Sequence, residues 1–371
     1  METKTERLLS LDIFRGMTIL GMILVNNPGS WSNVYPPLLH AKWNGCTPTD
    51  IIFPFFLFIV GVTTTFSLSK YRINGNNKEA YIRLLRRSAS IFLLGLFMAG
   101  FPHFDFTTIR IPGVLQRIAV VYFFTALIFL NVKKEKIIYI IAGLLLFYWA
   151  IMTLIPVPGV GYSNLEPSTN LGAWLDRLLL GGHLWSQSKT WDPEGILSTI
   201  PAIGTALIGV LTGYWLKSDN DKTTKTVMMF FYGSILMAVG YVWDFFFPIN
   251  KSLWTSSYVV YTGGLALIFL AACYWLIDVK DVKWWIKPFH IYGTNAIAVF
   301  FLSGILAVIM GMIKITESNG EVISLKSFLF KNIFLQIANP INASLLFAIS
   351  YVLLWLFLMW LLYRKKIFIK L

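Results

Sequence analysis

The feature that most constrains this chain is a series of ten apolar stretches, each long enough to cross a lipid bilayer. A membrane-spanning helix needs about 20 mostly apolar residues. With 56% hydrophobic and only 13% charged residues, the 371-residue chain has too much apolar surface for a water-soluble globule. We therefore predict an all-α, polytopic membrane protein with about ten transmembrane helices. The stretches lie at about residues 8–27, 50–69, 88–105, 112–131, 137–157, 194–216, 226–247, 253–277, 288–312 and 342–363.

The positively charged residues predict how the chain is oriented. The formal net charge is +13, which in a soluble protein would favour nucleic acid or another anionic partner. In a membrane protein, Lys and Arg gather in cytoplasmic loops. With the N-terminus inside, alternating spans place 21 of the 31 Lys and Arg residues in cytoplasmic segments, including the basic cluster Lys70–Arg87, and 8 in outer segments. We predict cytoplasmic N and C termini, no nucleic-acid partner, and one membrane domain over residues 1–371.

Three outer loops are long enough to carry functional residues. They lie at about 28–49, 158–193 and 313–341, and the third contains an amphipathic stretch near 325–337.

Ionisable residues inside a span are costly and indicate function by default. Asp12 and Arg15 lie three residues apart in the first span, so they share one face of a helix. They form either a local ion pair that anchors the helix end or a polar lining for a pocket open to the cytoplasm.

Arg117, preceded by Gln116, lies inside the fourth span, and Asp50 lies at the outer start of the second at a similar depth. An ion pair between Arg117 and Asp50 would offset both desolvation costs, in a structural or a catalytic role. Asn26 ends the first span on the outer side, where capping of the helix is the ordinary role of an asparagine.

Among the histidines, His40 has the most suggestive position, in an outer loop just before a helix start. A neutral imidazole there can act as a general base or a nucleophile, although a surface histidine often has no such role. Asp192 and Glu194 flank Pro193 at the start of the sixth span, which predicts N-terminal capping. The motifs of nucleotide hydrolysis, zinc proteolysis and serine hydrolysis do not occur in the sequence.

Several segments, in order along nearly the whole chain, resemble the heparan-α-glucosaminide N-acetyltransferase family. The most specific one contains His40-Ala41-Lys42-Trp43-Asn44-Gly45. The others are Arg7–Gly16 with Val25-Asn26, Asp50–Pro54, Arg110–Arg117, Asp192–Gly195, Asn250–Trp254 and Ser257–Val259.

This resemblance implies a transmembrane N-acetyltransferase. It would move acetyl from cytoplasmic acetyl-CoA to the amine of a glucosamine-type sugar on the periplasmic side, without a metal. The catalytic residues would be His40, as general base or acetyl carrier, and Asn26, as a donor to the developing oxyanion. The predicted acceptor-binding residues are Trp43, Asn44, Asp50, Asp192 and Glu194, and those predicted to bind acetyl-CoA are Asp12, Arg15, Gln116 and Arg117.

The resemblance also implies a multi-pass protein of a bacterial inner membrane and a homodimer. Two alternatives stay open. One is a permease for an amino sugar or glycan fragment without acyl chemistry, for which the buried Asp12, Arg15 and Arg117 would line a substrate path. The other is an acyltransferase that O-acylates a polysaccharide.

Overall fold

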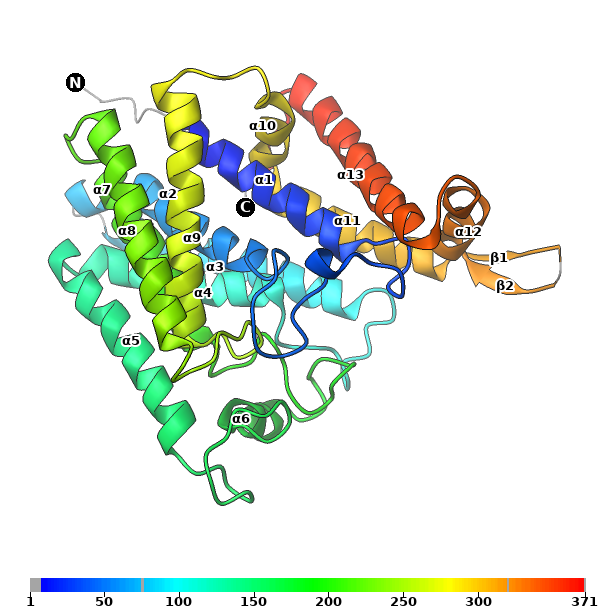
Figure 1. The fold of residues 1–371 in the computed structure, drawn as a ribbon, viewed down its shortest axis with the longest axis horizontal. Helices are drawn as coiled ribbons and strands as arrows, with labels where there is room; N and C mark the ends of the chain where they lie inside the picture. Colours follow the sequence, from blue (N-terminus) through cyan, green and yellow to red (C-terminus); the bar gives the residue numbers. More distant parts are fainter. Residues whose placement is uncertain (1–7, 75–76, 319, 370–371) are drawn as a thin grey trace. The chain divides into compact units, whose positions relative to one another are not determined.

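The computed structural model describes residues 8–74, 77–318 and 320–369, and these are almost entirely helical (Figure 1). Arg7, the first residue of the family-like segments, lies outside the described residues. The helices are α1 (Leu9–Asn26), α2 (Ile52–Asn74), α3 (Asn77–Gly100), α4 (Val114–Asn131), α5 (Lys134–Leu154), α6 (Leu171–Leu180), α7 (Thr199–Leu216), α8 (Lys222–Trp243), α9 (Ser256–Tyr274), α10 (Lys287–Thr294), α11 (Ala296–Met312), α12 (Leu325–Asn332) and α13 (Pro340–Arg364).

Each of the ten predicted stretches falls on a helix or a helix pair, so the prediction of a polytopic membrane protein is confirmed. Eight described helices are long and apolar enough to cross a membrane, and α10 and α11 pass together as a broken span bent by 84°. The remaining predicted span corresponds to α3. This helix begins at Asn77 rather than at 88, and its first half carries charged residues such as Glu79 and Arg83. Those charges place the start of α3 in a polar environment.

The bend between α10 and α11 lies at Asn295, whose backbone is not helical (φ −126°, ψ 38°). The Asn295 side chain donates to Ile367 O at 3.2 Å and accepts from Ile369 N at 2.8 Å. These hydrogen bonds satisfy backbone groups of the C-terminal segment, which explains why an asparagine is placed at the break.

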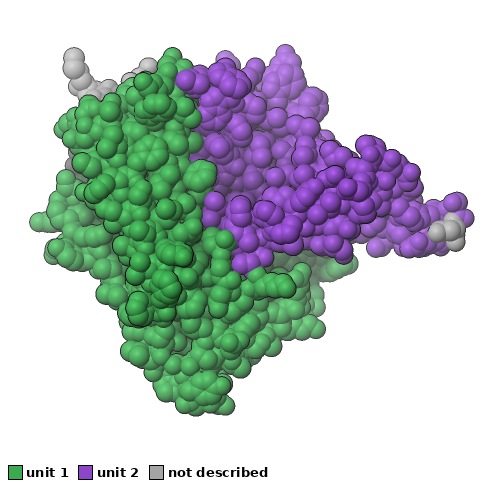
Figure 2. Space-filling model, in the orientation of Figure 1, with its two compact units in different colours: residues 1–11, 42–46, 54–281 green, residues 12–41, 47–53, 282–371 purple. Residues whose placement is uncertain are grey.

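The described chain divides into two compact units, coloured in Figure 2. Unit 1 contains residues 42–46 and 54–281 with the start of α1, and unit 2 contains residues 12–41, 47–53 and 282 onward. The prediction of one functional membrane domain over residues 1–371 is not tested by this division and stays a prediction.

In unit 1, the closest helix pair is α8 with α9 (Figure 1). A Cβ added to Gly264 would lie 2.5 Å from Met237 N, and one added to Gly240 would lie 2.4 Å from Tyr261 N. Glycines therefore let the two backbones approach directly, as small residues commonly do between membrane helices.

Two backbone hydrogen bonds join loops of unit 1 that lie far apart in the sequence. Ile111 N donates to His183 O and Gly45 N donates to Ile249 O. The first bond joins the α3–α4 loop to the segment before α7, and the second joins residues 42–46 to the α8–α9 loop. The charge pattern predicts that all four segments lie outside. We call this the loop end of unit 1.

The other end of unit 1 carries loops predicted to be cytoplasmic. Arg72, near the end of α2, donates to Phe129 O and Val132 O at the C-terminus of α4 and to the Tyr214 hydroxyl. A guanidinium placed over terminal carbonyls satisfies groups that the helix leaves unpaired. We call this the basic end of unit 1.

Unit 2 consists of α1 from Asp12 onward, α10–α13 and a short antiparallel hairpin of β1 (Lys314–Thr316) and β2 (Val322–Ser324). The start of α13 is fastened to the chain after α1, since Gly29 N donates to Ser344 O at 3.2 Å. The amphipathic stretch near 325–337 forms α12, followed by a 3₁₀ turn at Phe334–Gln336.

Candidate functional site

His40 and Asp50 form a hydrogen-bonded pair in unit 2. Nδ1 of His40 lies 2.7 Å from Oδ1 of Asp50. The Asp50 side chain is completely buried, whereas 49% of the His40 side chain is exposed. The pair thus presents an accessible imidazole that is supported from behind by a buried carboxylate.

The loop between the two residues is folded around the Asp50 carboxylate. Its Oδ2 accepts from Ala41 N at 3.0 Å and from Thr47 N at 2.9 Å. The Thr47 hydroxyl lies 3.0 Å from Oδ2 and 2.7 Å from Leu39 O. These donors stabilise the ionised form of the carboxylate, because each hydrogen bond replaces one that water would make.

The pairing fixes which nitrogen of the ring can react. An ionised carboxylate only accepts, so Nδ1 of His40 carries the proton and donates it to Asp50. In the neutral ring, Nε2 then carries the lone pair. A buried carboxylate also stabilises the imidazolium that forms when Nε2 takes a proton or an acyl group. This arrangement supports base or nucleophilic chemistry at Nε2.

Asn26, predicted to assist His40, is the last residue of α1 and is exposed. The helix end is satisfied by the next residue, because Asn27 Nδ2 donates to Ile23 O at 2.8 Å. Within the part of the chain that the structure describes, the Asn26 side chain makes no hydrogen bond, so the capping role considered for Asn26 belongs to Asn27.

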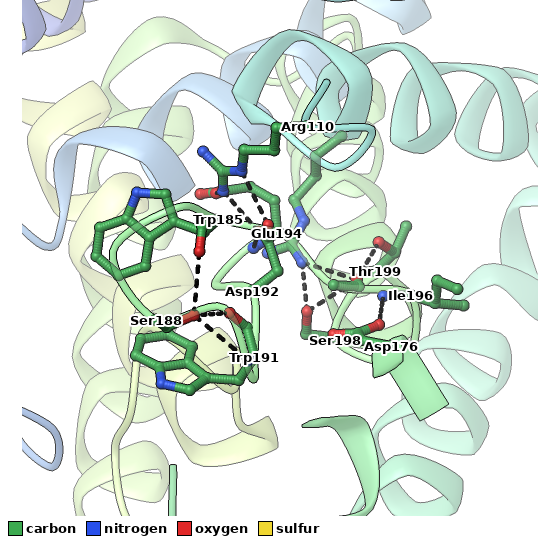
Figure 3. A network of polar contacts seen from close by, with 12 residues as sticks. Arg110, Asp176, Trp185, Ser188, Trp191, Asp192, Glu194, Ile196, Ser198 and Thr199 are labelled. Carbon is green, nitrogen blue, oxygen red and sulfur yellow. Dashed lines mark hydrogen bonds and ion pairs between the residues drawn. The ribbon is translucent and has the colours of Figure 1, made fainter. Parts of the chain in front are cut away.

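At the loop end of unit 1, Arg110 binds Asp192 and Glu194 (Figure 3). Its Nε and Nη2 donate to the two Asp192 oxygens at 2.8 and 2.5 Å, and Nη2 also lies 2.5 Å from Glu194 Oε2. Burial alone would lower the pKa of Arg110, but its hydrogen bonds and ion pairs with Asp192 and Glu194 outweigh burial and raise the pKa.

The capping role predicted for Asp192 and Glu194 is wrong, because both acids form ion pairs with Arg110 instead. We call Arg110, Asp192 and Glu194 the Arg110 triad. Helix α7 begins at Thr199, with Ser198 at its N-cap, so both acids precede the helix by several residues. They join the segment before α7 to the α3–α4 loop through Arg110.

Asp176, on the short helix α6, is a buried acid that the sequence analysis did not select. It is 3% exposed, and its Oδ1 accepts from Ile196 N at 2.9 Å (Figure 3). A Cβ at Gly195 would lie 2.0 Å from Asp176 Oδ2, so only glycine allows this approach. Burial and the charge of Asp192 raise the pKa of Asp176 to about 6, although the hydrogen bond from Ile196 and the charges of Arg117 and Arg177 act against them.

A narrow cleft with room for about one water molecule lies at this end of unit 1. It is lined by predicted acceptor residues Trp43 and Asp192, and by Asp176, Trp191 and Ser198 among others. The Trp43 ring is held in place because Nε1 donates to Leu165 O at 2.9 Å, and it packs edge-on against Trp191 with centroids 5.1 Å apart. We call this the tryptophan cleft.

Asn44, also predicted to bind the acceptor, is exposed, and its Oδ1 accepts from Asn250 Nδ2 at 3.1 Å. The neighbouring Gly45 has φ 108° and pairs with Asn250 in an isolated bridge. These contacts fasten residues 42–46 to the α8–α9 loop.

Gln116 and Arg117 lie near the start of α4 and are almost completely buried. Arg117 Nη2 donates to Gly195 O at 3.1 Å and to the Ser198 hydroxyl, and its guanidinium lies 5.1 Å from the Trp254 ring centroid. Arg117 lies in unit 1 and Asp50 in unit 2, so the ion pair predicted between them is not tested and stays a prediction. Among the described residues, Arg117 Nε, Arg117 Nη1 and Gln116 Nε2 have no hydrogen-bond partner.

Asp12 and Arg15 form the local ion pair considered from their spacing, with Arg15 Nη1 3.2 Å from Asp12 Oδ1. The same nitrogen donates to Gly293 O at 3.3 Å, which ties α1 to α10 within unit 2.

The predicted residues thus separate into two groups. Unit 2 holds His40, Asp50, Asn26 and the pair Asp12–Arg15, while the remaining predicted residues lie at the loop end of unit 1. The ion-pairing role of Arg110 was not predicted, although Arg110 begins one of the family-like segments. Asp176, Trp191 and Ser198 were not predicted either, because the sequence offers no signal for them beyond residue type.

The sequence of this chain is similar to those of proteins in one known family. A family model described as heparan-alpha-glucosaminide N-acetyltransferase, catalytic, matches residues 7–242. The matched region includes the His40–Asp50 pair, the Arg110 triad and Asp176.

Two similar curated proteins carry the name heparan-alpha-glucosaminide N-acetyltransferase. The human protein is 31% identical over 79% of this chain and 52% of its own length, and the mouse protein is 30% identical over 80% and 53%. A Bacillus acidopullulyticus protein named as an uncharacterized 39.9 kDa protein in the amylase 3′ region is 32% identical over 41% of this chain and 43% of its own length. The chain spans about half the length of the two mammalian relatives.

Proposed function

Because this chain belongs to the heparan-alpha-glucosaminide N-acetyltransferase family, we propose that it transfers acetyl from acetyl-CoA to the amine of a glucosamine-type sugar. It is a multi-pass membrane protein of an acyltransferase family. We further propose that the donor is taken from the cytoplasm and that the acceptor is bound on the periplasmic side of a bacterial inner membrane.

The observation that carries the proposal is the hydrogen bond between His40 Nδ1 and Asp50 Oδ1. It leaves Nε2 as the basic nitrogen on an imidazole that is half exposed. A histidine in this state can remove a proton from an attacking amine or accept an acyl group itself.

In the reaction, the C–S bond of the thioester breaks and a C–N bond to the sugar forms. The sugar ammonium loses two protons overall. One leaves on the thiol of coenzyme A and the other is released, and His40 Nε2 is the group that moves them. If His40 is instead an acetyl carrier, the acetyl group bonds first to Nε2, and the amine then displaces the imidazole.

Two features support binding of acetyl-CoA. The basic end of unit 1 carries exposed cations that suit the phosphates of coenzyme A, such as Lys133, Lys134 and Lys222. Arg117 and Gln116 provide three buried donors without protein partners among the described residues, and such donors are costly unless an acceptor reaches them. The carbonyl oxygens of the pantetheine arm and its thioester are acceptors of this kind. The assignment of Asp12 and Arg15 to the acetyl-CoA site stays a prediction. The homodimer also stays a prediction.

The test measures release of the coenzyme A thiol by purified protein given acetyl-CoA, with and without glucosamine. We expect glucosamine to accelerate release in the unmutated protein and His40→Ala to lower the stimulated rate by roughly 100- to 10,000-fold. His103→Ala is the matched control, because His103 is also an exposed histidine of an outer loop. If His40→Ala released thiol as fast as the unmutated protein, the proposal would be wrong.

A further inference from the structure

We infer that the first half of α3 binds the phosphate of an anionic phospholipid through Arg86, with the charge of Arg87 beside it. The inference goes beyond acetyl transfer, because it concerns the lipid around the protein rather than the sugar or the acyl donor. It assigns a partner to two cations that receive no anion from the described protein.

One face of α3 is apolar and exposed over most of the helix. Its exposed apolar residues recur every three or four positions, so they form one continuous stripe on the helix surface. They are Ile82, Leu85, Ala89, Leu93 and Phe97. A large exposed apolar surface on a membrane protein is suited to contact with lipid acyl chains. We call these five residues the α3 stripe.

Arg86 lies within the α3 stripe. It follows Ile82 by four residues and precedes Ala89 by three, so its side chain lies between theirs on the helix surface. Ile82 and Leu85, on the N-terminal side of Arg86, are 60% and 61% exposed. Apolar surface therefore continues for about one helical turn beyond Arg86. An arginine at such a position extends its charged group toward the phosphates at the bilayer surface.

The guanidinium of Arg86 has no partner in the described protein. The Ser90 hydroxyl donates to the backbone carbonyl of Arg86 at 2.8 Å, whereas the exposed guanidinium makes no hydrogen bond or ion pair within the described ranges. A long, charged side chain in an apolar stripe is costly unless an anion or water reaches it.

Arg87 adds a second charge next to Arg86. Its guanidinium lies 4.8 Å from the centroid of the Tyr122 ring on α4, which holds the cation against the protein without neutralising it. Arg87 Nε is buried and, among the residues that the structure describes, has no hydrogen-bond partner. Two neighbouring guanidinium groups thus share one side of α3 without an acid.

The acid on this half of α3 is already engaged. Glu79 accepts from the Tyr71 hydroxyl at 3.0 Å and pairs with Arg83 at 3.6 Å. The segment 77–88 contains four Lys or Arg residues and one acid, which gives a net charge of +3. Such an excess beside an apolar surface favours anionic over zwitterionic lipids. The charge pattern also predicts that this segment faces the cytoplasm.

A phospholipid matches both features of the surface at once. Its acyl chains can cover the α3 stripe, and its phosphate can accept two parallel N–H bonds from the planar guanidinium of Arg86. A soluble phosphate would match the charge alone. A zwitterionic lipid would bring its own cation to the same place, so the structure favours a headgroup with a net negative charge, such as phosphatidylglycerol.

The experiment measures lipid binding to the purified 371-residue chain by native mass spectrometry. The probes are phosphatidylglycerol and phosphatidylcholine with the same acyl chains. We expect phosphatidylglycerol to bind more tightly and Arg86→Gln to weaken its binding by about fivefold, the effect of one basic residue near the bilayer surface. Binding of phosphatidylcholine should stay unchanged. The melting temperature in detergent should also stay unchanged, because Arg86 has no partner in the described protein.

Arg83→Gln is the matched control. It removes the same charge from the same part of α3, but Arg83 already pairs with Glu79, so phosphatidylglycerol should bind this variant as it binds the unmutated protein. Equal weakening by Arg83→Gln and Arg86→Gln would show attraction by overall charge and overturn the inference. Unchanged binding in Arg86→Gln would also overturn it.

A competitor distinguishes the two sources of phosphate. Adenosine 3′,5′-bisphosphate, a fragment of coenzyme A, should not displace phosphatidylglycerol. Displacement would assign the two arginines to the nucleotide of coenzyme A and overturn the lipid site. None of these measurements depends on acetyl transfer, so the lipid site and the proposed function can fail separately.

Discussion

Nδ1 of His40 lies 2.7 Å from Oδ1 of Asp50, and the rest of the Asp50 carboxylate is held by backbone amides of the same loop. The carboxylate therefore cannot turn away from the ring without losing its other hydrogen bonds. This makes Asp50 a positioning residue for the imidazole, whose role can be separated from that of His40 by substitution.

Asp50→Asn should lower amine-stimulated acetyl transfer by roughly 100- to 10,000-fold, because an amide can favour the wrong tautomer and does not stabilise an imidazolium. The measurement is the rate of thiol release at saturating acetyl-CoA and glucosamine. The double variant with His40→Ala should be no slower than His40→Ala alone, since the two residues act as one unit. Additive losses would contradict this role.

Arg110→Met should destabilise the protein by about 3–5 kcal/mol, because it leaves two buried carboxylates without their cation. Thermal unfolding in detergent measures the loss, and neutralising Asp192 and Glu194 as amides in the same chain should recover part of it. Arg83→Met is the control. The Arg83 pair with Glu79 is more than half exposed, so its loss should change stability by less than about 1 kcal/mol.

The spans could be predicted because the length of an apolar stretch is a local property of the sequence. The boundaries that differed depend on tertiary contacts. The break at Asn295 is stabilised by the chain near Ile367, which lies far away in sequence. The early start of α3 reflects a helix that continues beyond its apolar part, where charged residues such as Arg83 are exposed.

The site was less predictable than the spans. Resemblance selected His40, but predicted depth in the membrane did not reveal the contacts that Arg117 makes within unit 1. Depth does not say which side chains face one another, and Arg117 donates to Gly195 and Ser198. The capping role predicted for Asp192 is wrong for a related reason. Helix α7 begins only at Thr199, and the local sequence pattern could not reveal the contact of Asp192 with the distant Arg110.

The charge distribution predicts which end of unit 1 faces the cytoplasm. In a protein with Cys46 and Cys273 changed to serine, we expect Gln187→Cys to react with a membrane-impermeant maleimide added to intact cells whose outer membrane has been opened. Lys134→Cys should react only after the inner membrane is disrupted. Both positions are exposed, and they lie at the loop end and the basic end respectively. Reaction in the reverse order would invert the predicted topology.

Arg117→Lys should raise the KM for acetyl-CoA by about tenfold, because lysine keeps the charge but loses the planar arrangement of N–H donors. The KM for glucosamine should change less, and kinetics with each substrate varied in turn separate the two. Arg72→Lys is the matched control, since Arg72 uses its donors on Phe129 O, Val132 O and Tyr214. It should lower stability and leave the KM for acetyl-CoA unchanged. An equal rise in both variants would contradict a specific role for Arg117.

Asp176→Asn should stabilise the unliganded protein at pH 7.5, by up to about 3 kcal/mol. The pKa of Asp176 is raised to about 6 in the folded protein from 3.8, so ionisation above pH 6 costs folding free energy. This cost shrinks as the pH falls through 6 and is absent below 3.8. The gain in melting temperature over the unmutated protein should therefore be largest at pH 7.5 and fall to roughly a third of that gain at pH 4.5, with Glu166→Gln as the unaffected control. A loss of stability at pH 7.5 would mean that a protein cation already compensates Asp176. A gain would show instead that stability is given up to keep a charge in the cleft, as binding sites commonly require.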